Sequence, residues 1–280
     1  MLVLTLLAAG CGGAGQRGSG PFVANGPASR AVVWAAGDGA DGGPGAKAVA
    51  QLVERGHPDL FLYLGDVYPE GNATGYAHSY APAFGPLANR TAPTPGNHDW
   101  PEQSVGYSPY WTKARGLPPP LYYSFSAGGW RFLSLNSEIP SGPGSPQLRW
   151  LERQVRAPGD CRIAFWHRPR FSAGTVHGDY PPVDALWRTL QGHARLVLNG
   201  HEHDMQRMRA RQGLVELVDG AGGHSLYPLR RNYPGLVFAN RDQFGAIRLE
   251  LRPGSAKAAF ISITGQTLDR TRVGCHAAGA

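Results

Sequence analysis

Five short apolar runs in this sequence each end at a polar residue of a type that binds metal ions. Those residues are Asp38, Asp66, Asn97, His167 and His201. A further histidine, His203, follows two places after the last of them. Carboxylate, amide and imidazole groups supply the oxygen and nitrogen ligands that suit zinc, iron or manganese. Each residue alone is ordinary turn or core chemistry, so the prediction of a metal site depends on the whole set.

The apolar runs are predicted to be buried strands, because each is short and a turn follows it at once. They cover Ala31–Ala36, Leu60–Leu64, Thr91–Pro95, Arg162–Trp166 and Arg195–Leu198. In open α/β sheets, ligands bind at the carboxyl ends of the strands. Neighbouring strands would therefore bring the five polar residues to one edge of the sheet.

The segments between and after these strands predict a layered α/β domain. Helices are expected at Gly45–Arg55, Tyr76–Leu87, Gln147–Val155 and Val183–Gln191. A hairpin with a Gly-Gly turn is expected over Leu121–Asn136. The chain from Leu214 to Leu268 is expected to be mostly strands, most clearly at Leu214–Val218, Phe244–Leu251 and Ala258–Thr264.

Short sequence words surround the polar residues. They are GDG at Gly37–Gly39, GDVY at Gly65–Tyr68, GNHD at Gly96–Asp99, WH at Trp166-His167 and GHEH at Gly200–His203. In this order and spacing they closely resemble the calcineurin-like metallophosphoesterase family, and within it the purple acid phosphatase-like branch. The resemblance covers Ala31 to Leu268. It implies an α/β fold of two packed mixed β-sheets flanked by helices, a four-layer α/β/β/α sandwich.

The resemblance also implies a cofactor of two metal ions, iron with zinc, manganese or a second iron. Asp66 would bridge the two ions. The first ion would also be bound by Asp38 and His203. The second would also be bound by Asn97, His167 and His201. A bridging carboxylate is physically suited to this role, because it can hold two cations about 3.5–4 Å apart for in-line displacement at phosphorus.

A chain with this centre would be a metal-dependent phosphoester hydrolase, most simply a phosphomonoesterase of acid-phosphatase type. Metal-bound hydroxide would attack phosphorus in line, while His98 would stabilise the developing charge and protonate the leaving alcohol. A phosphodiesterase or nucleotidase with the same metal site is the alternative, because the ligands do not decide the substrate. A non-catalytic surface binding module is a further alternative, although all the expected ligands and His98 are present.

Two positions depart from the family pattern. Many members carry a histidine two residues after the first aspartate, where this chain has Ala40. Purple acid phosphatases also lack that histidine, and instead bind iron(III) with a tyrosine three residues after the bridging aspartate. Here Tyr68 lies two residues after Asp66. Either the shorter loop still lets Tyr68 reach the metal, or Tyr68 does not bind.

Three further residues are candidates for contact with the substrate. His177 lies in the loop after His167 and is expected to line the phosphate pocket, and Arg168 is expected to meet the anionic substrate. His224 lies in a glycine-rich turn and is either at the pocket rim or structural. On a continuing strand His201 and His203 would share one face, because side chains two apart point the same way.

The N-terminus predicts export. Met1–Ala9 is apolar and too short to span a bilayer, and Leu7–Cys11 resembles a bacterial lipobox in which Cys11 is acylated. We therefore predict a lipoprotein-type signal segment over 1–11, a flexible Gly/Ser/Pro linker over 12–30 and one catalytic domain over 31–280. The protein would be lipid-anchored at the outer face of a bacterial membrane, in the periplasm or at the cell surface. Another cleaved signal and a cytosolic N-terminus are the alternatives.

Cysteine usage and charge limit the partners. Besides Cys11 the chain has Cys161 and Cys275, which would form one disulfide in an oxidising compartment, or else remain free.

The net charge of +7 favours a small anionic phosphate ester and an anionic membrane surface as partners, or simply keeps the surface solvated. No nucleic-acid partner is expected, because the arginine clusters match no binding motif and lack interleaved aromatics. The oligomeric state stays open.

Overall fold

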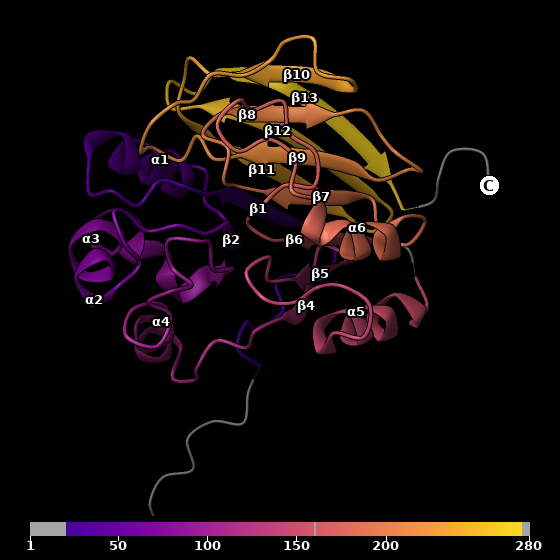
Figure 1. Cartoon of the computed structure of the whole chain (residues 1–280), viewed down its shortest axis with the longest axis horizontal. Helices are drawn as coiled ribbons and strands as arrows, with labels where there is room; N and C mark the ends of the chain where they lie inside the picture. Colours follow the sequence, from indigo (N-terminus) through magenta and orange to yellow (C-terminus); the bar gives the residue numbers. More distant parts are fainter. Residues whose placement is uncertain (1–20, 160, 276–280) are drawn as a thin grey trace, which may run out of the picture.

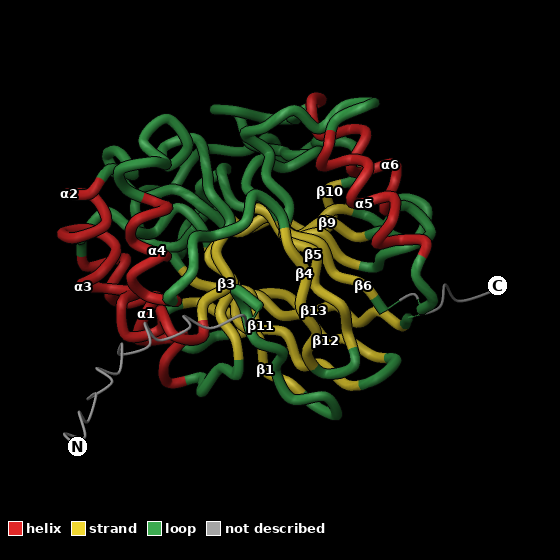
Figure 2. Tube along the Cα trace, turned by 90° about the horizontal axis from the view of Figure 1, so that it is seen from below, coloured by secondary structure: helices red, strands yellow, loops and turns green. Residues whose placement is uncertain are grey.

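The computed structural model describes residues 21–159 and 161–275. Within them, two mixed β-sheets pack against each other and helices lie outside both (Figure 1). Figure 2 shows the helices in two groups on opposite sides of the strands, with loops gathered at one end. The predicted sandwich of two mixed sheets flanked by helices is thus confirmed.

The first sheet has the strand order β13-β12-β11-β1-β2-β3. Its strands are β1 (Ala31–Ala36), β2 (Leu60–Tyr63), β3 (Thr91–Pro93), β11 (Gly245–Arg252), β12 (Ser255–Ser262) and β13 (Thr267–Gly274). The three N-terminal strands run parallel to one another, whereas β11, β12 and β13 are antiparallel. β1 joins the two groups by pairing antiparallel with β11. The carboxyl ends of β1, β2 and β3 therefore lie along the same edge.

The second sheet has the strand order β10-β8-β9-β7-β6-β5-β4. Its strands are β4 (Tyr123–Ala127), β5 (Trp130–Ser134), β6 (Arg162–Phe165), β7 (Leu196–Asn199), β8 (Met205–Met208), β9 (Val215–Asp219) and β10 (Leu236–Asn240). β5, β6, β7 and β9 run parallel, and antiparallel strands complete both sides. The predicted hairpin is confirmed as β4 and β5, with its turn at Gly128 and Gly129, both at positive φ.

The helices are short, as the high glycine and proline content suggests. They are α1 (Pro44–Arg55), α2 (Ala73–Gly75), α3 (Ala81–Phe84), α4 (Tyr107–Arg115), α5 (Pro146–Arg156) and α6 (Asp184–Leu190), with a π-turn at Tyr76–Tyr80 and 3₁₀ turns at Gly85–Arg90 and Pro181–Val183. The helical segment predicted over Tyr76–Leu87 is confirmed, but its helix type changes from π to α to 3₁₀ along the chain. Pro82 has no N–H for a regular turn, and Ala81 N bonds to Tyr76 O five residues back instead.

Two apolar cores hold the layers together. The larger one includes residues of both sheets and of the helices α1, α3 and α4. Its strands contribute alternate residues, and in β11 Ile247 and Leu249 are buried while Arg248 is partly exposed. The smaller core lies between the second sheet and the helices α5 and α6. α5 contributes Leu148 and Leu151, which recur on one face of the helix. These cores fix the strands whose ends carry the candidate site.

The packed domain begins earlier than the predicted boundary at residue 31. Phe22 and Val23, assigned to the linker 12–30 by composition, are 8% and 2% exposed. Phe22 packs edge-on against Tyr123, with ring centroids 5.4 Å apart. The apolar pair therefore ties residues 21–30 to the second sheet. The signal segment 1–11, with Cys11, lies outside the described residues.

Cys161 and Cys275 are joined in a disulfide, with Cα atoms 4.5 Å apart. Cys161 precedes β6 and Cys275 follows β13, so the bond links the start of β6 in the second sheet to the end of β13 in the first. Across residues 21–159 and 161–275, we find no helix whose length and apolar content would let it span a membrane.

Candidate metal centre

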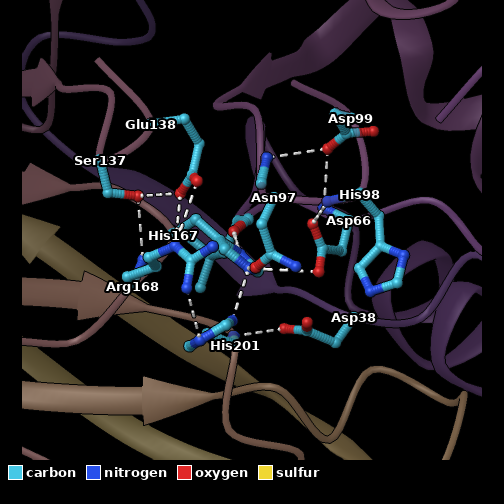
Figure 3. A network of polar contacts seen from close by, with 12 residues as sticks. Asp38, Asp66, Asn97, His98, Asp99, Ser137, Glu138, His167, Arg168 and His201 are labelled. Atoms are coloured by element: carbon cyan, nitrogen blue, oxygen red, sulfur yellow. Dashed lines mark hydrogen bonds and ion pairs between the residues drawn. The ribbon is translucent and has the colours of Figure 1, made fainter. Parts of the chain in front are cut away.

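The predicted ligands follow strands of both sheets. Each lies two to four residues after a strand: Asp38 after β1, Asp66 after β2, Asn97 after β3, His167 after β6 and His201 after β7. Figure 3 shows these side chains pointing toward one another. Asp38, Asp66 and His201 have positive φ values of 58°, 68° and 73°. Such backbone is rare for residues other than glycine, and it turns each side chain sharply into the cluster.

One group of ligand atoms gathers around His167, which is fully buried. His167 Nε2 lies 3.2 Å from Asp66 Oδ2, 3.1 Å from Asn97 Oδ1 and 3.1 Å from His201 Nδ1. One ligand atom each of Asp66, His167 and His201 lies within 4.8 Å of the others. These atoms present lone pairs to a shared volume, which is the arrangement a cation requires.

A second group gathers around the hydroxyl of Tyr68. This oxygen lies 2.8 Å from His203 Nε2, 3.0 Å from Asp38 Oδ1 and 3.3 Å from Asp66 Oδ2. The structure therefore brings Tyr68 into the ligand cluster, despite its spacing of two residues after Asp66. The two groups share Asp66 Oδ2, which lies close to both Tyr68 and His167.

The electrostatics of the cluster fit a cation. Burial lowers the pKa of His167, but the Asp66 and Asp38 carboxylates outweigh it and raise that pKa to about 10. The Asp66 and Asp38 carboxylates thus favour positive charge at this place, and a bound metal ion would compete with a proton for it. Burial, followed by the neighbouring His167, lowers the pKa of His201 and keeps it in its neutral, ligating form. Burial and the two carboxylates raise the pKa of Tyr68, so its deprotonation requires a nearby cation.

Buried partners orient the ligand rings. His167 Nδ1 donates to the carbonyl of Leu64 at 2.8 Å, so its Nε2 faces the cluster. His203 Nδ1 lies 2.9 Å from Ser225 Oγ, which turns its Nε2 toward Tyr68. Each histidine is thereby fixed from its far side.

His201 and His203 both reach the cluster, but they do not lie on a continuing strand. Residues 201–204 form a bend, and β8 begins only at Met205. The bend arises because His201 N donates to Asp38 Oδ2 at 2.6 Å, which holds His201 at positive φ. The two rings consequently serve different ends of the cluster, His201 beside His167 and His203 beside Tyr68.

His98 borders a pocket next to the cluster. Its backbone N–H donates to Asp66 Oδ1 at 2.9 Å, and its ring Nδ1 donates to the Pro69 carbonyl at 2.7 Å. The pocket has a volume of about 480 Å³ and is lined by Asp41, Tyr68, Pro69, His98, His224 and Tyr227. His224 is therefore in the pocket wall, where it stacks on Tyr68 with ring centroids 4.0 Å apart.

Arg168 and His177 approach the cluster from the other side. The guanidinium of Arg168 is held by Glu138 at 3.0 Å and lies 3.3 Å from His201 Nε2. In Figure 3, Arg168 and His98 lie on opposite sides of Asp66. The ring of His177 stacks on His201, with centroids 4.0 Å apart and an interplanar angle of 24°. Arg168 and His177 are thus both beside the predicted ligands.

Asp99 is a residue that the sequence interpretation missed. Its Oδ2 accepts from the N–H groups of Asp66 and Gly96, both at 2.8 Å, and Tyr76 donates to its Oδ1 at 3.0 Å. Burial and the nearby Asp66 carboxylate raise the pKa of Asp99 to about 7. Asp99 thereby ties the turn that carries Asn97 and His98 to the turn that carries Asp66. The available signal was its place as the last residue of the GNHD word.

The chain is similar in sequence to curated purple acid phosphatases. Probable purple acid phosphatase 20 of Arabidopsis thaliana is 28% identical over 189 residues, 58% of this chain and 43% of the relative. Purple acid phosphatase 15 of the same plant is 29% identical over 125 residues, 39% of this chain and 23% of the relative. The chain thus spans less than half the length of these curated relatives.

Solved structures show the same fold. The purple acid phosphatase PPD1 from yellow lupin seeds has a TM-score of 0.73 at 19% identity, covering 89% of this chain and 55% of that chain. GAP50, the anchor in the inner membrane complex of Plasmodium, has a TM-score of 0.72 at 15% identity, covering 88% and 89%. A family model described as calcineurin-like phosphoesterase matches residues 32–205, more than half of the chain. The chain therefore belongs to the calcineurin-like phosphoesterase family.

Proposed function

We propose that the protein is a metal-dependent phosphoric ester hydrolase, specifically a phosphomonoesterase of acid-phosphatase type. The observation that carries the proposal is the position of Asp66 Oδ2, which lies 3.2 Å from His167 Nε2 and 3.3 Å from the Tyr68 hydroxyl. One carboxylate oxygen thus serves two adjoining groups of ligand atoms. Such sharing is what a centre of two neighbouring cations requires.

The residues present fit two cations, because their donors are oxygen and imidazole nitrogen. The first site would comprise Asp38, Asp66, Tyr68 and His203. The second would comprise Asp66, Asn97, His167 and His201. Bound cations would neutralise phosphate oxygens and acidify water to supply the nucleophile. An iron ion paired with iron, zinc or manganese would suit this donor set, and coordination by a Tyr68 phenolate would favour iron(III) at the first site.

His98 is the proposed proton donor. Its Nδ1 is occupied by the bond to the Pro69 carbonyl, so Nε2 is the ring atom left to deliver a proton to the leaving alcohol. The pocket that His98 borders has room for that alcohol, with a volume of about 480 Å³. On the opposite side of the cluster, Arg168 and His177 would hold phosphate oxygens. The Glu138 carboxylate orients the Arg168 guanidinium for this task.

Export with a lipid anchor at Cys11 stays part of the proposal. The disulfide between Cys161 and Cys275 supports an oxidising compartment, where such bonds persist. Mass spectrometry of the mature N-terminus tests the anchor directly. An acylated Cys11 is expected, and an intact unprocessed Met1 would contradict it.

The first experiment is metal analysis of the purified full-length protein, with hydrolysis assays on an aryl phosphate monoester and a diester. About two metals per chain and monoester turnover are expected. A visible purple colour would place Tyr68 on iron(III). Two metals with turnover of the diester alone would favour the phosphodiesterase alternative. A protein that binds no metal and hydrolyses neither ester would overturn the proposal.

A further inference from the structure

The loop that carries His177 is irregular, yet buried side chains hold its backbone. It runs from Arg170 to Gly178, between β6 and α6. In its first half, the N–H groups of Arg170 and Phe171 donate to the Glu216 carboxylate at 2.7 and 3.0 Å. The Ala173 N–H donates to Gln206 Oε1 at 2.7 Å. Side chains of two neighbouring strands, β9 and β8, thus replace the main-chain partners that a strand would provide.

Glu202 holds the second half of the loop. Its Oε1 accepts from the N–H of His177 at 3.0 Å and from the N–H of Gly178. The Glu202 side chain is fully buried, and its carboxylate fills the space beside Gly174. A Cβ placed on Gly174 would lie only 2.0 Å from the Glu202 carboxyl carbon. The carboxylate and the loop therefore fit together without spare room.

Glu202 also lies in the chain directly between two predicted ligands, His201 and His203. The His177 ring stacks on His201 with ring centroids 4.0 Å apart. Glu202 is joined to both residues, to His201 through the chain and to His177 through the hydrogen bond from its N–H. One residue thus fixes a ligand and a substrate-facing ring relative to each other.

We propose that Glu202 is a positioning residue: by accepting the backbone N–H groups of His177 and Gly178, it holds the His177 imidazole over His201, where phosphate oxygens bind. The inference rests on the proposed function. Without the carboxylate, two inward-facing N–H donors lose their acceptor, and the loop relaxes toward water to satisfy them. Catalytic geometry tolerates little displacement, since a shift of about 1 Å can lower turnover about 100-fold.

Glu216 provides a matched comparison within the same loop. Its side chain is also fully buried and also accepts two loop N–H groups. Those groups belong to Arg170 and Phe171, which lie farther from His177 along the chain. Loss of either carboxylate should loosen the loop, but loss of Glu202 alone should act through His177.

The test is a double-mutant cycle on the metal-replete full-length protein. Glu202→Ala should lower kcat/KM about 10–100-fold, mainly through KM, with both metals retained. The double variant Glu202→Ala/His177→Ala should be no worse than His177→Ala alone, because the two residues act as one unit. Glu202→Gln keeps an acceptor oxygen and should restore kcat/KM to within about threefold of wild type. Glu216→Ala should lose stability, and its effect on kcat/KM should add to that of His177→Ala.

Amide hydrogen exchange gives a readout independent of activity. Glu202→Ala should accelerate exchange at His177 and Gly178 more than Glu216→Ala does. Additive losses in the cycle, with protected amides at these two residues, would overturn the positioning role. If Glu202→Ala does not fold, Glu202→Gln and Gly174→Ala provide the same comparison. A wild-type protein that hydrolyses no phosphate ester would instead refute the proposed function, while the exchange measurement still decides whether Glu202 holds the loop.

Discussion

The predicted metal ligands and the His177 loop reach the same small volume by different means. The ligands follow strands closely, so the sheets place them; Asp66 leaves β2 after two intervening residues. The loop is instead held by side chains from other segments, chiefly Glu202 in the bend before β8 and Glu216 in β9. The sheet therefore fixes the atoms that define the cluster, while buried carboxylates fix the ring that would adjust substrate binding. Substitutions among the predicted ligands should abolish metal binding, whereas substitutions in the loop should weaken substrate binding gradually.

The largest effect is expected at the shared ligand. Asp66→Asn removes the charge that both groups of ligands use, so neither metal should be retained. Turnover should fall roughly 10³-fold or more, because the several kcal/mol of metal assistance is lost. Metal content and kcat/KM measure this, with Asp269→Asn as the remote control, since that carboxylate pairs with Arg207 on the far strands. Retention of two metals in the Asp66 variant would contradict the shared role.

His98→Ala should separate chemistry from metal binding. Both metals should remain, while turnover of an alkyl phosphate should fall roughly 10²–10⁴-fold for lost acid catalysis. The loss should be smaller for an aryl phosphate whose leaving group needs little protonation. Unchanged turnover of the alkyl ester would remove His98 from the mechanism.

Gly174→Ala should have a smaller effect on activity, because it disturbs only the His177 loop. The new methyl group would meet the Glu202 carboxylate at 2.0 Å and push it from the loop, without backbone strain, because Gly174 is not at positive φ. We expect KM to rise about tenfold while metal content is unchanged. Gly142→Ala is the matched control, since nothing lies within 4 Å of its added Cβ. Equal KM values for the two variants would show that the loop tolerates the displacement.

The smallest effect concerns stability alone. Burial raises the pKa of the Glu216 carboxyl to about 8, although the N–H groups of Arg170 and Phe171 oppose the shift. The stabilisation from a raised pKa is complete below the unfolded value near 4.5 and is lost as pH rises toward 8. Glu216→Gln removes this titration, so its stability relative to wild type should improve by up to about 1.4 kcal/mol per pH unit across that window. Urea unfolding at pH 5, 6.5 and 8 measures the trend; a difference independent of pH would contradict it.

The sequence allowed the clustering of the predicted ligands to be foreseen because its signals are local. A short apolar run followed closely by Asp38, Asp66 or His167 indicates both the candidate ligand and its position after a strand. Whether Tyr68 reaches the cluster could not be predicted from the sequence, because a loop that is one residue shorter changes where the tyrosine hydroxyl points. The bend after His201 was also hidden, since it depends on a bond to Asp38 from another strand.

The anchors of the His177 loop could not be predicted from the sequence. Glu202 lies 25 residues from His177, and Glu216 lies 46 residues from Arg170. Such pairs become neighbours only through the order of strands β7, β9 and β8. The helix α4 was missed for a related reason, since Tyr107 and Trp111 bury one narrow face within an otherwise polar segment. Tertiary packing, rather than local propensity, decides both features.

The left-handed backbone at Asp38, Asp66 and His201 lowers the stability of the fold at residues that the proposed activity requires. Each such residue costs about 1–2 kcal/mol relative to ordinary backbone, and glycine would bear the same conformation with little penalty. Glycine at any of these three places would relieve that cost but remove a predicted ligand, and at Asp38 or Asp66 it would also remove the acceptor of a backbone N–H group. An engineer who wants a hardier variant should leave these positions untouched and look for stability in the cores and surface loops.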